Sequence, residues 1–228
     1  MVSTASKQIL FGKPVFINRP HGTHTKAKLI LAHGAGAPMD SVFMDKMAAV
    51  IADHSSIEVI RFEFDYMQQR RSGGSKRPPP KVSALVEEWS QWLSLFNKHD
   101  DTPLLLGGKS MGGRIATLMD SDPGIAQLWQ GVICLGYPFH PARKPSTLRT
   151  AHLAKSKSPT LMIQGTRDPL GNRAEVATYN LPQKIFLEWV ESADHDLKPL
   201  KASGVSHDQA LLQACSAITD FTLKLNRE

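Results

Sequence analysis

The chain has 228 residues, 41% of them hydrophobic, and this length suits one domain with a full core, which we expect to span residues 1–228. No apolar run approaches the ~18 residues of a membrane helix, and the N-terminus lacks the apolar segment of a signal peptide. We therefore expect a cytoplasmic protein with no membrane partner. Its formal net charge is +6, and its two cysteines, Cys134 and Cys215, are expected to be buried thiols.

Short apolar runs alternate with amphipathic segments, which is the pattern of an α/β fold with a mostly parallel sheet and helices on both faces. A pair of weak strands is expected at about residues 7–18. The next strands are expected at 27–32, 57–64, 103–107, 131–136, 159–164 and 184–190.

Two helices have clear sequence signals. One is predicted from an apolar stripe with spacings of three and four residues. The other begins at a capping box, Ser206 with Gln209, and carries its own inward stripe to the C-terminal end. The two stripes are Val82, Leu85, Val86, Trp89, Trp92, Leu93 and Phe96, and then Leu211, Ala214, Cys215, Ile218, Phe221 and Leu225.

Residues 68–81 carry five positive charges and no negative charge, together with three consecutive prolines. Glycine and proline predict a loop here. The segment is either a solvated connector or a contact for an anionic substrate. Nucleic acid is not an expected partner, because no aromatic or groove-reading pattern accompanies the charge.

The most informative motif is G-x-S-x-G at residues 108–112, between an apolar run and a helical segment. In this context the motif predicts a sharp turn that exposes the hydroxyl of Ser110 as a nucleophile. Gly108 and Gly112 flank the serine, because side chains at these positions would collide where the chain folds back. A phosphate-binding loop is the rival interpretation, but it needs glycine where the chain has Pro103.

A serine nucleophile needs a base and an acid that orients the base, in the chain order Ser, Asp or Glu, His. Asp168 follows a predicted buried strand, and His195 follows the next one, so we predict Ser110, His195 and Asp168 as the catalytic residues. Asp194 and Asp196 compete for the role of acid.

The oxyanion of such a site needs backbone N–H donors. We expect them at Met111, directly after the nucleophile, and at Ala35 in the small-residue loop 33–37, with Gly36 as second choice. His33 in this loop is a candidate substrate contact or a structural histidine.

Positive side chains close to these residues suggest an anionic substrate. Lys109 adjoins the serine and Arg167 adjoins the acid, so both are candidate substrate contacts, although solvated surface charge is the plainer interpretation. His21 and His24 lack a third ligand nearby, so we expect neither a metal nor another cofactor. Residues 137–158 are too few for a lid domain, so the site is expected to be open.

These motifs together resemble a small, capless α/β-hydrolase family that includes dienelactone-hydrolase-like bacterial proteins and the eukaryotic Tex30/KANL3-like proteins. The resemblance implies an eight-stranded, mostly parallel sheet and the Ser–His–Asp site, but no particular substrate. From the site residues we predict hydrolysis of a carboxylic ester or thioester by acyl transfer, without a cofactor. A binding or scaffold protein on the same fold is the alternative, and the oligomeric state is open. The segments that carry the resemblance are 33–37, 61–64, 66–67, 108–114, 136–141, 164–168 and 194–199.

Overall fold

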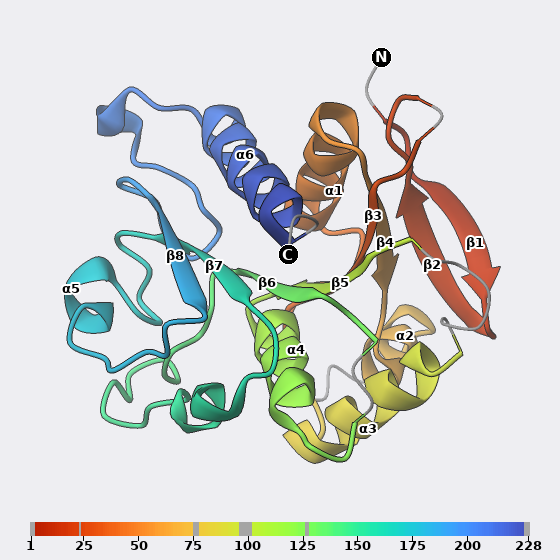
Figure 1. The fold of residues 1–228 in the computed structure, drawn as a ribbon, viewed down its shortest axis with the longest axis horizontal. Helices are drawn as coiled ribbons and strands as arrows, with labels where there is room; N and C mark the ends of the chain where they lie inside the picture. The colour runs from red at the N-terminus through yellow and green to blue at the C-terminus, as the bar shows by residue number, and fades with distance from the viewer. Residues whose placement is uncertain (1–2, 23, 75–77, 96–101, 126–127, 226–228) are drawn as a thin grey trace.

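The computed structural model describes residues 3–22, 24–74, 78–95, 102–125 and 128–225. Its centre is an eight-stranded sheet in the order β1-β2-β4-β3-β5-β6-β7-β8 (Figure 1). β1 and β2 form an antiparallel hairpin, β2 runs antiparallel to β4, and the other six strands are parallel. The predicted sheet is therefore confirmed. The strands are β1 (Ser6–Leu10), β2 (Lys13–Asn18), β3 (Ala27–Ala32), β4 (Ile57–Phe62), β5 (Leu104–Lys109), β6 (Gly131–Leu135), β7 (Thr160–Gly165) and β8 (Ile185–Val190).

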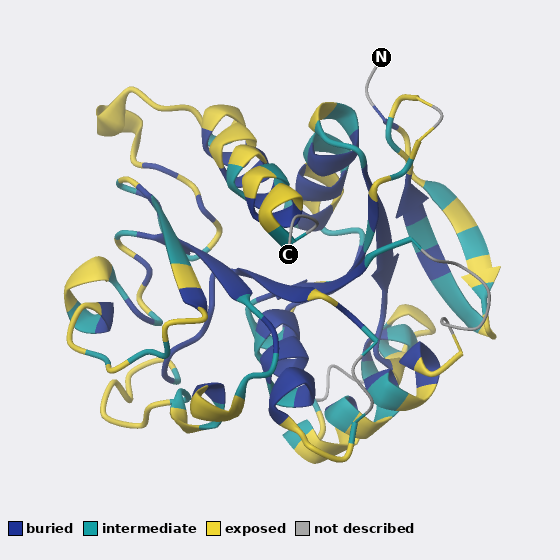
Figure 2. Ribbon diagram, in the orientation of Figure 1, coloured by how far each residue is buried: buried dark blue, intermediate teal, exposed yellow. Residues whose placement is uncertain are grey.

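Helices cover both faces of this sheet, and a separate apolar cluster lies under each layer. One layer is α1 (Val42–His54) with α6 (His207–Leu225), and the other contains α3 (Val82–Leu93) and α4 (Met111–Ser121) (Figure 1). Every residue of β4, β5, β6 and β7 is buried, as Figure 2 shows for the centre of the sheet. Burial on both faces explains why these strands are near-continuous apolar runs in the sequence.

The capping box of the last helix is confirmed. The Ser206 hydroxyl accepts from the Gln209 N–H at 3.1 Å, and the Ser206 N–H donates to the Gln209 side chain at 2.8 Å. The predicted inward residues from Leu211 to Phe221 are buried, and Leu225 is half-buried. In α3 the stripe is confirmed as far as Leu93, while Phe96 lies outside the described residues.

The basic segment differs from its prediction. Arg70 and Arg71 form the last turn of α2 (Asp65–Arg71), so they lie in a helix and not in the predicted loop, which begins only at Ser72. Residues 75–77 lie outside the described part of the chain. The segment 137–158 contains one short 3₁₀ helix, η1 (Ala151–Lys155), so it does not build a lid.

The remaining short elements are α5 (Arg173–Val176) and η2 (Lys201–Ser203). Cys134 and Cys215 are both buried free thiols, as predicted. Within the described ranges, no helix has the length and apolar character needed to cross a membrane.

Candidate active site

Ser110 occupies a strained turn between β5 and α4. Its φ of 52° and ψ of −111° are unusual for a residue with a side chain. The flanking glycines make this turn possible: a Cβ on Gly108 would lie 2.3 Å from the Gly112 carbonyl carbon, and one on Gly112 would lie 2.5 Å from the Ala32 carbonyl oxygen. The sequence-based reason for both glycines is therefore confirmed.

His195 follows β8 and contacts the carboxylate of Asp168, with 2.7 Å between His195 Nδ1 and Asp168 Oδ2. Asp168 is fully buried, and it also accepts from the Leu170 N–H and from the Gln164 amide, both at 2.8 Å. Because a carboxylate only accepts, Nδ1 of His195 carries the proton and Nε2 is left as the acceptor. Gln164 was not singled out in the sequence, since glutamine in a strand has no local signature.

The competing acids have other partners. Asp194 caps its own loop, because its carboxylate accepts the backbone N–H groups of Asp196 and Lys198 at 2.9 and 3.0 Å. Asp196 pairs with Lys109, with 3.1 Å between Nζ and Oδ1. Of the three candidate acids, the structure brings only Asp168 to the ring of His195.

Ser110 and His195 line one open cleft of about 420 Å³ together with the loop 34–37, and this cleft includes Ala35. Met111 is the first residue of α4, and the first N–H groups of a helix lack an intrahelical acceptor. Both predicted oxyanion donors thus belong to segments beside the serine.

Two side chains to which the sequence analysis assigned no role hold the loop that carries Ala35. The Tyr66 hydroxyl donates to the Ala35 carbonyl at 3.1 Å, and burial raises the pKa of Tyr66, which keeps this donor protonated. Arg61 donates to the Met39 carbonyl at 2.7 Å from a fully buried position. Only the fold brings these residues to the loop, which is why the local sequence could not show this role.

Arg71 also helps to hold this loop, and its charged group contacts acids of the protein. Its guanidinium donates to Glu63 at 2.7 Å and pairs with Asp40, and these two carboxylates raise the pKa of Arg71. Glu63 is fully buried and accepts the Met39 N–H at 3.0 Å.

His33 is fully buried and uses both ring nitrogens within the protein. Nδ1 lies 2.6 Å from the Gly34 carbonyl, and Nε2 accepts the Phe64 N–H at 3.3 Å. Burial lowers the pKa of His33, which favours the neutral ring that this pairing requires. These contacts support the structural role and leave neither nitrogen for a substrate.

Lys109 lines the cleft, but its ammonium is held by the loop of His195. Nζ donates to the His195 carbonyl at 2.8 Å, pairs with Asp196, and lies 5.3 Å from the centre of the Phe43 ring. Lys109 is 6% exposed, and burial lowers its pKa against the opposing effect of Asp196. These contacts indicate a residue that positions His195.

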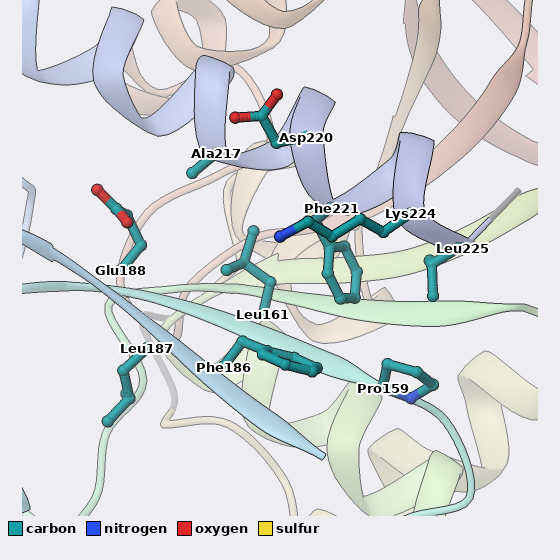
Figure 3. A pocket seen from close by; sticks show the side chains of 10 residues that line it. All are labelled: Pro159, Leu161, Phe186, Leu187, Glu188, Ala217, Asp220, Phe221, Lys224 and Leu225. Carbon is teal, nitrogen blue, oxygen red and sulfur yellow. The ribbon is translucent and has the colours of Figure 1, made fainter. Parts of the chain in front are cut away.

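Arg167 is exposed and donates to the Ser192 carbonyl at 3.1 Å, outside the lining of the cleft. A separate apolar hollow of about 280 Å³ lies between β8 and α6, with Phe186 and Phe221 in its walls (Figure 3). It contains none of the predicted site residues. In the described ranges, no group of three or more His, Cys, Asp or Glu side chains is placed to hold a metal ion.

A strained serine between a parallel strand and a helix, beside a histidine that contacts a buried carboxylate, is the arrangement of the α/β hydrolases. Residues 25–223 match the family described as "Alpha/beta hydrolase domain", and the chain belongs to this family. None of the curated proteins matches the chain significantly. The relation to Tex30/KANL3-like proteins stays a prediction.

Solved structures share the fold at low sequence identity. A serine hydrolase homologue from Coxiella burnetii has 18% identity and a TM-score of 0.65, covering 96% of this chain and 97% of its own. Est1E from Butyrivibrio proteoclasticus has 13% identity and a TM-score of 0.65, with 99% and 100% covered. Dienelactone hydrolase from Anabaena variabilis has 18% identity and a TM-score of 0.64, with 97% of each chain covered.

Proposed function

We propose that the protein is a serine hydrolase that cleaves a carboxylic ester or thioester through Ser110, His195 and Asp168. The observation that carries the proposal is the strained Ser110 turn at a cleft shared with His195, whose Nδ1 lies 2.7 Å from buried Asp168. Similar folds in proteins named as a serine hydrolase homologue and a dienelactone hydrolase support the same reaction class.

The reaction follows from these positions. The Ser110 hydroxyl attacks the substrate carbonyl while His195 Nε2 takes its proton, and the negative oxygen is bound by the N–H groups of Met111 and Ala35. The tetrahedral intermediate collapses to an acyl-serine, and His195 returns the proton to the leaving alcohol or thiol. Water then repeats the sequence, releasing the acid and restoring Ser110. Asp168 holds the His195 ring in the required tautomer throughout.

The test is labelling with a fluorophosphonate probe, followed by a panel of ester and thioester substrates. Ser110→Ala should lose labelling and lose turnover by a factor on the order of 10⁶ if the three residues act as a unit. Ser203→Ala, at an exposed serine in η2, is the matched control and should retain both. Labelling of another serine, or unchanged turnover in Ser110→Ala, would contradict the proposal. A folded wild-type protein that neither labels nor hydrolyses the panel would favour the scaffold alternative.

A further inference from the structure

Two arginines that do not line the cleft of Ser110 and His195 belong to segments next to it. Arg114 lies in the first turn of α4, and its N–H donates to the Ser110 carbonyl at 3.1 Å. Arg149 lies in the segment 137–158 that follows β6, and its N–H donates to the Phe139 carbonyl at 2.7 Å. Both are half-buried.

Three polar side chains tie the backbones of these arginines together. The Thr117 hydroxyl donates to the Arg114 carbonyl at 2.8 Å, and it lies 2.9 Å from Nε2 of His152. The Tyr137 hydroxyl donates to the Arg149 carbonyl at 2.8 Å and lies 3.4 Å from the same His152 nitrogen. These contacts hold the backbones of Arg114 and Arg149 close to each other, between α4 and the segment after β6.

Among the residues that the structure describes, no carboxylate pairs with either arginine. Within the described residues, neither guanidinium makes a hydrogen bond or an ion pair, and Nε of Arg114 is buried without a partner. Arg61, Arg71 and Arg173 each pair with an acid. Burial and the charge of Arg114 lower the pKa of Arg149, and the same causes lower the pKa of His152 to about 4. Partly desolvated positive charges without an anion are unfavourable, and a bound anion would relieve this cost.

The position of the pair relates it to the catalytic residues. Four residues separate Arg114 from Ser110, about 6 Å along the helix axis, and helical side chains tilt toward the N-terminus, where Ser110 lies. The segment that carries Arg149 is anchored nearby, since the Tyr137 N–H donates to Gln164 at 2.7 Å. The amide of Gln164 also donates to Asp168.

We propose that Arg114 and Arg149 together bind a free carboxylate of the substrate, so that the preferred substrate is an ester or thioester carrying a second, ionised carboxyl group. The planar guanidinium matches a carboxylate through paired hydrogen bonds, which suits this ligand better than a neutral group. This inference rests on the proposed hydrolase function and names its substrate class.

The test compares anionic esters with neutral isosteres. The 4-nitrophenyl half-esters of succinate, glutarate and adipate place the anion on the acyl side, and 3-butyryloxybenzoate places it on the leaving group. In the controls a carboxamide replaces the free carboxylate. For at least one of these substrates, the wild-type kcat/KM should be higher for the carboxylate ester than for its carboxamide control. Arg114→Gln and Arg149→Gln should each lower kcat/KM for that carboxylate ester by about tenfold or more. In these two variants, kcat/KM for the carboxamide control should change less than twofold. Arg143 is an exposed arginine of the same segment, and Arg143→Gln should leave kcat/KM for both the carboxylate ester and the carboxamide unchanged.

Two controls separate this inference from the proposed function. The neutral fluorophosphonate should still label Ser110 in both arginine variants, which shows that the site is intact. The inference is overturned if the wild type shows no preference for any anion, or if both variants lose anionic and neutral turnover equally. If the wild type neither labels nor hydrolyses, glutarate binding by calorimetry decides: binding that Arg114→Gln abolishes supports the arginine pair, and absence of binding overturns it.

Discussion

At the scale of single residues, Asp168 differs from an asparagine in one decisive property: both of its oxygens accept. Asp168→Asn would present an N–H₂ group or force the other tautomer of His195, which then could not take the Ser110 proton. We expect the fold to persist and kcat to fall by up to ~10⁴. Asp194→Asn is the matched control, because an amide oxygen can still accept from Asp196 and Lys198. Steady-state kinetics check the pair, and a larger loss in Asp194→Asn would mean that the acid is misassigned.

Lys109 offers a second test at this scale. Lys109→Met keeps the apolar stem but removes the ammonium that binds the His195 carbonyl at 2.8 Å. Because small displacements of a catalytic base are costly, kcat should fall by about tenfold to a hundredfold, equally for anionic and neutral esters, with little change in KM. Rates of fluorophosphonate labelling should fall in parallel. An increase of KM confined to anionic esters would instead support direct substrate contact, which is one of the two interpretations of Lys109 from the sequence.

At the scale of elements, the turn at Ser110 depends on close backbone contact between β5, α4 and β3. Gly112→Ala would place a Cβ 2.5 Å from the Ala32 carbonyl oxygen, where only backbone movement can make room. We expect the free energy of unfolding to drop by about 1–3 kcal/mol, as for other overpacked sites, with loss of activity. Gly36→Ala is the control, since its Cβ would meet nothing within 4 Å. Equal urea denaturation midpoints for the two variants would contradict this account of the turn.

The sequence predicts these elements well where the signal is local. Apolar runs located the parallel strands to within two residues at each end, because central strands are buried on both faces. Composition failed at Arg70 and Arg71, where glycine and proline further along suggested a loop. Their helix begins at Asp65, whose N–H is bound by Glu88 of α3, a contact between residues 23 positions apart. No local pattern could reveal it.

The same distinction between local and long-range signals applies to the residues of the candidate site. Ser110, Asp168 and His195 could be located because each follows a recognisable strand in a fixed chain order. The supporting roles of Gln164, Tyr66 and Arg61 could not be assigned, although these residues lie in segments that carry the resemblance, since each has a partner far away in the sequence. For Lys109 the sequence indicated the right place and a different use, because adjacency to Ser110 does not show where a long side chain points.

At the scale of the whole molecule, the net charge of +6 does not show which positive side chains are already paired with acids within the protein. Arg71 is neutralised by Glu63 and Asp40, and Lys109 by Asp196. Among the described residues, Arg114 and Arg149 lack such partners, which is why we propose them as the residues that bind a substrate anion. In this proposal two half-buried side chains select the charge of the substrate, and selection does not depend on long-range attraction by the basic segment 68–81.

The open cleft sets a limit on the acyl chain. Its volume is about 420 Å³, and the segment 137–158 contains only the short 3₁₀ helix η1, which does not form a lid. A longer acyl chain gains about 0.8 kcal/mol per methylene only where each methylene is buried, and the small volume of the open cleft limits how many methylenes it can bury. In a series of 4-nitrophenyl esters from acetyl to dodecanoyl, kcat/KM should be highest for short, water-soluble chains and level or lower beyond them. Measurements below the critical micelle concentration give the comparison, with the uncatalysed rate of each ester subtracted. An optimum at long chains, or activation by a lipid interface, would contradict this limit.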